Sequence, residues 1–260
     1  MIKNFMFICL LVVFFTKTSF SAYNSDNFSN DFHNYLLKDL EKHKAQDASP
    51  IILGDLSEYL TDVDPLSVYG FIGFELERIK TMIRSIHFDK DSARYKIIGK
   101  TNVSGTKSDF VGYLNVISHY QITEPITSHG LLIVMFDAEF IESGNSAHSG
   151  IFKGFYYLIL SDIAGRIEKA KAIPHFLANN TFVGRWTSKS GKMNFPVLWG
   201  EDYIFEDLES LFYKITGQAT IDESIINKSW NTYFDATTLG VKQSIKEAAL
   251  RYENNKWWND

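Results

Sequence analysis

Six segments between residues 94 and 199 have the pattern of β-strands, whose side chains repeat with a period of two. They are residues 94–101, 109–122, 130–141, 149–161, 179–188 and 193–199. This period places alternate side chains on opposite faces of a β-strand. Since short turns rather than long helices separate the segments, the strands are expected to pair antiparallel. The pattern predicts a meander that forms a barrel or a sandwich.

Helical spacing is predicted on both sides of this β-region, at residues 26–46 and 241–257. Residues 47–70 fit a connector with a short apolar piece at 51–53. Residues 71–88 fit either a helical face or a strand, and their β-branched content favours a strand. We therefore predict an α+β protein, mainly an antiparallel β meander, barrel-like, with one N-terminal and one C-terminal helix.

The first 21 residues have the pattern of an export signal. Lys3 is followed by an unbroken apolar run at residues 5–15, and Ser19 and Ser21 supply small residues for cleavage before Ala22. The run is shorter than the ~20 residues that span a bilayer. The expected divisions are a signal peptide (1–21), an N-terminal helix and connector (22–67), the barrel-like domain (68–240) and a C-terminal helix (241–260). The mature chain would be secreted or periplasmic, without a stable membrane span.

Composition and charge exclude several classes of function. The chain is 45% hydrophobic and carries a formal net charge of −5, which argues against a disordered protein and against a nucleic-acid-binding one. Its single cysteine, Cys9, lies in the predicted signal, so the mature chain would contain no disulfide and no cysteine-based zinc site.

Three of the predicted strands share the pattern Phe-x-Gly-x-large. They read Phe110-Val111-Gly112-Tyr113-Leu114, Phe152-Lys153-Gly154-Phe155-Tyr156 and Phe182-Val183-Gly184-Arg185-Trp186. The period of two puts the Phe, the Gly and the last residue on one face, so each glycine leaves a notch between bulky side chains. The notches either shape a ligand cavity or only permit curvature and packing. The candidate ligand or interface residues are Phe110, Gly112, Phe152, Gly154, Tyr156, Phe182, Gly184, Trp186, Trp257 and Trp258.

Two resemblances follow from these strands. Residues 182–187 and the hairpin at 190–192 resemble the Gly-x-Trp strand of lipocalin-like and avidin-like barrels, which implies a barrel open at one end to a small apolar ligand. Residues 68–258 resemble a group of uncharacterised exported proteins of Bacteroidetes. The shared motifs are Ile98-Gly99-Lys100-Thr101, Asp109 to Gly112, Ser149 to Gly154, Phe182 to Thr187, Trp199-Gly200 and Trp257-Trp258. The second resemblance supports the fold and implies no chemistry.

Few residues suggest catalysis. Asp137 and Glu139 lie two apart on one strand, so they could serve as the acid and nucleophile of a glycosidase, or they could form an acidic solvent-facing surface. The four histidines near strand ends or loops lack a metal-ligand spacing. They are His119, His129, His148 and His175. No metal site and no cofactor are therefore predicted.

The preferred function is a non-enzymatic binding module that takes a small apolar ligand in the barrel or a protein partner on its surface. The alternatives are an inhibitor or immunity-type interaction protein and a carboxylate-based hydrolase. Trp257 and Trp258 end the tail helix. They are expected to dock this helix over one barrel mouth or to form an exposed anchor for a partner.

Overall fold

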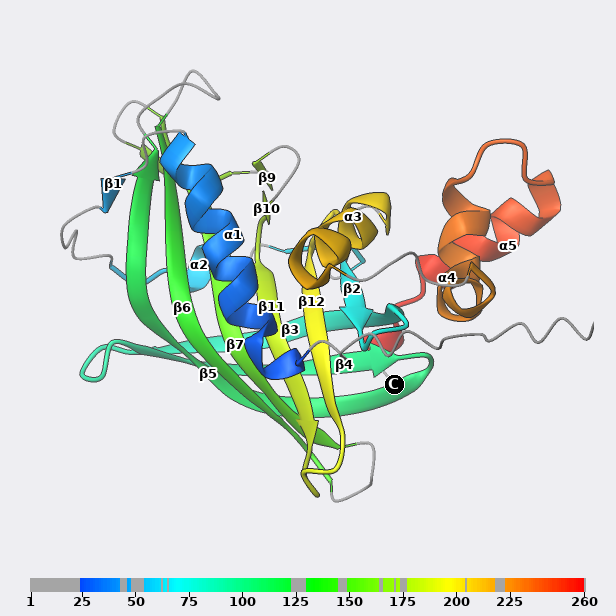
Figure 1. Ribbon diagram of the computed structural model, residues 1–260, viewed down its shortest axis with the longest axis horizontal. Coiled ribbons are helices and arrows are strands. Elements are labelled where there is room, and N and C mark those ends of the chain that lie inside the picture. Colours follow the sequence, from blue (N-terminus) through cyan, green and yellow to red (C-terminus); the bar gives the residue numbers. More distant parts are fainter. Residues whose placement is uncertain are drawn as a thin grey trace, which may run out of the picture.

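A computed structural model describes residues 24–259, except 43–45, 48–53, 62, 65, 123–129, 145–148, 164–165, 171, 174–176, 204 and 218–222 (Figure 1). The predicted signal peptide, Cys9 and the apolar piece at 51–53 lie outside the described residues.

Eight antiparallel strands pair into a closed ring. In order around the ring they are β2 (Val68–Ile72), β3 (Glu77–Asp89), β4 (Arg94–Val103), β5 (Thr106–Ile122), β6 (Gly130–Glu142), β7 (Gly150–Ile163), β11 (Thr181–Ser188) and β12 (Asn194–Glu201), and β12 pairs back to β2. The strands range from 5 to 17 residues, so the ring is uneven rather than a regular barrel.

Four short strands lie beside the ring. β1 (Gln46–Asp47) pairs with β5, β8 (Arg166–Lys169) pairs with β7, and β9 (Ala172–Ile173) pairs with β10 (Leu177–Ala178). The antiparallel meander and the α+β class are confirmed. Residues 71–88, for which a strand was favoured, contain the end of β2, a turn and most of β3.

The helices are more numerous than the sequence pattern predicted. They are α1 (Phe28–Lys42), preceded by the 3-10 turn η1 (Ser25–Asn27), then α2 (Ser57–Thr61), α3 (Phe205–Thr216), α4 (Glu223–Thr237) and α5 (Gln243–Glu253), followed by the 3-10 turn η2 (Trp257–Asn259). The predicted tail helix is α5, whereas α3 and α4 lie in the segment that was assigned to the barrel-like domain and were not predicted. Within the described ranges, no helix is both long enough and apolar enough to cross a membrane.

Helix α1 covers the outer face of the ring (Figure 1). Its apolar side chains recur every four residues and are buried together; they are Phe28, Phe32, Leu36 and Leu40. The Phe32 ring lies 5.9 Å from the ring of Tyr157 on β7. A repeat near 3.6 residues puts these side chains on one face, which is buried against the sheet and, at Phe28, against Phe212 of α3 with ring centroids 6.1 Å apart.

The second half of strand β7, residues 156–160, is buried on both of its faces. Tyr156 and Leu158 belong to the cluster inside the ring, whereas Tyr157 and Ile159 belong to the outer cluster under the helices. A strand covered on both sides needs no polar alternation, which accounts for its nearly continuous apolar run.

Helix α2 contributes to closing one end of the ring. Leu60 is fully buried in the interior cluster. The Tyr95 hydroxyl, at the start of β4, accepts a hydrogen bond from the Leu56 N–H at 3.1 Å and donates to the Gly54 carbonyl at 3.3 Å. The connector is thereby fixed to the end of the ring where β3 turns into β4.

The glycines of the repeated motif allow neighbouring strands to approach closely. Gly154 and Gly184 lie directly opposite each other on β7 and β11. A Cβ atom on Gly154 would lie 2.1 Å from the Val183 carbonyl oxygen, and one on Gly112 would lie 2.3 Å from the Phe140 ring. The neighbouring strand fills these notches, as the curvature and packing interpretation expects.

The C-terminal helices are fixed to the outer face of β3. The Glu253 carboxylate accepts hydrogen bonds from Arg78 at 2.8 and 2.9 Å, from Lys80 at 2.8 Å and from Thr232 at 2.6 Å. The Arg78 guanidinium also lies 5.1 Å from the ring centroid of Trp230 on α4. Around this ion pair, α4 and α5 pack together beside the ring (Figure 1).

Trp257 and Trp258 are buried, with 5% and 9% of their surfaces exposed. Arg84 of β3 donates a hydrogen bond to the Trp258 carbonyl at 2.6 Å. The pair therefore docks against the outer side of the ring, which differs both from the expected place over a mouth and from an exposed anchor.

We expect Gly154→Ala to lower the free energy of unfolding by about 1–3 kcal/mol, because its Cβ atom would overlap the β11 backbone. Gly54→Ala is the matched control, since its Cβ atom would meet nothing within 4 Å. Chemical denaturation of both variants measures the effect. Equal stability of the two variants would contradict the close-approach account.

The ion pair of Glu253 predicts acid sensitivity. Burial raises the pKa of Glu253, but the hydrogen bonds and charge of Arg78, with hydrogen bonds from Lys80 and Thr232, outweigh burial and lower that pKa from 4.5 to about 2. A lowered carboxyl pKa stabilises the fold fully above pH 4.5, and this stabilisation is lost as the pH falls towards 2.

Glu253→Gln should therefore lower the free energy of unfolding at pH 7 by about 3 kcal/mol. It should also flatten the pH dependence of stability between pH 4.5 and 2. Glu247→Gln, at an exposed position of the same helix, should change neither quantity. Denaturation at several pH values checks both effects. If Glu253→Gln still lost stability between pH 4.5 and 2 as the wild-type protein does, Glu253 would not be the group responsible.

Candidate functional site

One end of the ring is hollow. The turns β2–β3, β4–β5, β6–β7 and β11–β12 all meet there, since the strands alternate in direction. They surround a cavity of about 530 Å³, which we call the mouth cavity. Its lining residues are Ile72, Gly73, Phe74, Glu75, Glu77, Thr101, Val103, Ser104, Thr106, Ser108, Glu142, Phe152, Trp186, Met193 and Phe195. Among these residues none comes from α4, α5 or η2, so the C-terminal helices do not form its walls.

Packed aromatic rings lie at the inner side of the mouth cavity. The Phe182 and Trp199 rings stack with centroids 4.2 Å apart, and the Phe152 ring meets Trp199 edge-on at 5.4 Å. The Phe140 ring lies 5.5 Å from Phe182. Since Phe152 lines the mouth cavity and Trp199 lines a second, smaller cavity, this cluster separates the two spaces.

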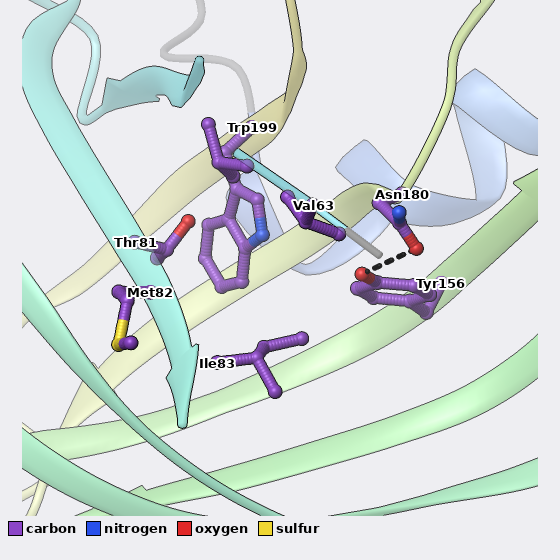
Figure 2. A pocket seen from close by; sticks show the side chains of 8 residues that line it. Val63, Thr81, Met82, Ile83, Tyr156, Asn180 and Trp199 are labelled. Atoms are coloured by element: carbon purple, nitrogen blue, oxygen red, sulfur yellow. Dashed lines mark hydrogen bonds between the residues drawn. The ribbon is translucent and has the colours of Figure 1, made fainter. Parts of the chain in front are cut away.

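The smaller cavity has a volume of about 20 Å³, which suits one water molecule and no larger ligand (Figure 2). On one side of it the Tyr156 hydroxyl donates to the Asn180 side-chain oxygen at 3.0 Å. Burial, and to a lesser degree the charge of Glu201, raises the pKa of Tyr156 well above its ordinary value, so the phenol stays neutral. On the other side the Thr81 hydroxyl is buried and has no hydrogen-bond partner among the described residues.

Glu142 is a buried acid at the wall of the mouth cavity. Its exposed fraction is 4%. One carboxylate oxygen accepts from the Thr101 hydroxyl at 2.8 Å. The other accepts from the Gly150 N–H at 2.9 Å and from the Trp186 indole N–H at 2.8 Å. All three donors are neutral, so they orient the carboxylate without balancing its charge.

Trp186 forms an aromatic wall next to this acid. Its ring stacks on Phe195 with centroids 6.0 Å apart and planes only 6° from parallel. The absence of a side chain at Gly150 makes this position possible, since a Cβ atom there would lie 2.3 Å from the indole. The hydrogen bond to Glu142 fixes the remaining rotation of the ring.

The structure brings five of the ten sequence-predicted binding residues together inside the ring. Phe110, Phe152, Tyr156, Phe182 and Trp186 are all buried in one interior cluster. Of these, Phe152 and Trp186 line the mouth cavity and Tyr156 lines the smaller one. Gly112, Gly154 and Gly184 lie between strands and line neither cavity.

The carboxylates proposed for a hydrolase lie elsewhere. Asp137 is exposed on the outer face of β6, and Glu139 on the same face forms an ion pair with Lys153 at 2.7 Å. Among the described residues, neither lines a cavity. This placement corresponds to the solvent-facing interpretation of the pair.

Of the four histidines considered for a metal site, the structure describes His119. His119 is 9% exposed on β5, and its Nε2 atom has no hydrogen-bond partner in the described part of the chain. His129, His148 and His175 lie outside the described residues. Across the described ranges, no three His, Cys, Asp or Glu residues are grouped so as to hold a metal ion.

Sequence reasoning missed Glu142, although a signal was present. Val134, Phe136, Ala138 and Phe140 alternate along β6 and face the interior. Glu142 continues this alternation at the next inward position, but the predicted strand ended at residue 141. Glu142 therefore faces the interior of the ring, whereas Asp137 and Glu139 face outward.

Comparison with known proteins adds no assignment to this geometry. No protein-family model, curated protein or solved structure matches the chain. The two resemblances noted in the sequence therefore stay predictions.

Proposed function

We propose that the protein is a non-enzymatic binding module that holds a small, largely apolar ligand in the mouth cavity. The observation that carries the proposal is the cavity itself, which has a volume of about 530 Å³ and lies at the end of the ring where four turns meet. Ligand sites are typically concave, apolar and few in a protein, with a small number of placed polar groups.

The walls suit a ligand that is apolar over most of its surface. The apolar part comes from Ile72, Phe74, Val103, Phe152, Trp186, Met193 and Phe195. These residues come from five strands and two turns, so the ring itself holds most of the wall. Such a preorganised site loses little conformational entropy on binding.

Export is part of the same proposal. The pattern of residues 1–21 supports it, and a chain without cysteine after cleavage could fold in an oxidising compartment without mispaired thiols. A ligand-binding function outside the cytoplasm would then act on molecules taken from the surroundings or the envelope.

A protein partner is the second candidate function. Ile98, Val111 and Ile141 are neighbours across β4, β5 and β6 and are each about two-fifths exposed on the outer face. Exposed apolar rows of this kind can mark interaction surfaces. The row lines none of the cavities found among the described residues, whereas the mouth cavity has room for a ligand, and we therefore favour the ligand.

Filling the cavity tests the ligand proposal. Ser108 faces the cavity from β5, and Lys107 beside it is exposed. Ser108→Trp should weaken binding of the fluorescent apolar probe phenylnaphthylamine at least about tenfold, equivalent to about 1.4 kcal/mol. Lys107→Trp, which adds the same side chain outside the cavity, should leave binding unchanged.

The measurement is a fluorescence titration of the wild-type protein and both variants. Equal loss of binding in the two variants would mean that the probe binds elsewhere. Failure of the wild-type protein to bind the probe would refute the proposal.

A further inference from the structure

The charged residues that line the mouth cavity are acids, whereas lysines lie on the adjoining turns. Among the described residues that line it are Glu75, Glu77 and Glu142, with no lysine, arginine or histidine. Lys189 lies on the adjoining β11–β12 turn, and its ammonium group donates a hydrogen bond to the Gly144 carbonyl. The cavity is therefore negatively charged, in a chain whose formal net charge is also negative.

Of these three acids, Glu142 is expected to attract a bound cation most strongly, because it is the buried one. A carboxylate can accept about four hydrogen bonds, and the three donors on Glu142 leave one oxygen able to accept another. Charges interact more strongly away from water, because the local dielectric constant is lower. A cation that entered the cavity would gain both this attraction and a hydrogen bond, whereas an anion would meet repulsion.

The aromatic walls also favour a cation. Trp186 and Phe195 present stacked rings, and Phe152 and Phe74 add two more to the lining. The face of an aromatic ring attracts an ammonium group, and tryptophan does so most strongly. The same rings supply apolar contact area for the rest of a ligand.

We propose that the ligand of the mouth cavity is a small organic cation, an amine with an apolar body, whose ammonium group binds the Glu142 carboxylate. The apolar body packs against Phe152, Trp186 and Phe195, and Glu75 and Glu77 attract the cation at the rim. This inference rests on the proposed ligand-binding function and adds the charge class of the ligand.

Three probes of equal chain length test the charge class. Octylamine is cationic at pH 7, octanol is neutral and octanoate is anionic. Isothermal titration calorimetry on the wild-type protein should show octylamine binding at least about tenfold more tightly than octanol, and octanoate binding more weakly than octanol.

Variants on β6 then assign the selectivity to one residue. Glu142→Gln keeps the size of the side chain but removes its charge, so octylamine should lose its advantage over octanol. Glu139→Gln is the matched control, since Glu139 lies on the same strand and faces outward. It should retain the wild-type preference.

The outcomes separate the two proposals. If none of the three probes binds and phenylnaphthylamine also fails to bind, the ligand-binding function itself is refuted. If octanol or octanoate binds as tightly as octylamine, the cation proposal is overturned while ligand binding stands. Unchanged selectivity in Glu142→Gln would also overturn it, and the wild-type comparison decides the question if that variant fails to fold.

Discussion

The close approach of strands at glycine positions is the constraint on which the rest of the structure depends. Gly154 and Gly184 oppose each other on β7 and β11, and neither position has room for a Cβ atom beside the neighbouring backbone. A ring of eight strands needs strong local coiling to close, and missing side chains allow it. Closure brings four turns to one end, and the mouth cavity is the space that they surround.

Both faces of the ring are covered where the sheet is most apolar. Helix α1 lies on the outer face, and aromatic rings fill the interior behind the mouth cavity. The C-terminal helices are held by the ion pair between Arg78 and Glu253 and by Trp230 of α4, which is buried in the outer cluster. The body of the fold thus rests on apolar packing, whereas its last helices depend in addition on a charged contact that acid weakens.

Local patterns in the sequence predicted much of this fold and less of the site. The period of two located the long strands, because a strand that packs on one face alternates whatever its partners are. Helices α3 and α4 were missed, although Leu208, Leu211 and Phe212 have helical spacing. The place of the tail depends on Arg78 and Glu253, which are 175 positions apart, and no local pattern encodes such a contact.

The site shows the same division. Phe152 and Trp186 were predicted from their strands and line the mouth cavity. Glu142 was missed because the predicted strand stopped one residue too early, and its importance appears only when β4, β7 and β11 bring Thr101, Gly150 and Trp186 around it.

The most direct test of the central claim is the indole N–H spectrum of isotope-labelled protein during titration with octylamine. The five tryptophans report from different places, and only Trp186 both lines the mouth cavity and donates to Glu142. We predict the largest shift for the Trp186 signal and little change for Trp230, Trp257 and Trp258. Shifts confined to those three tryptophans, or no shift at saturating octylamine, would contradict the account.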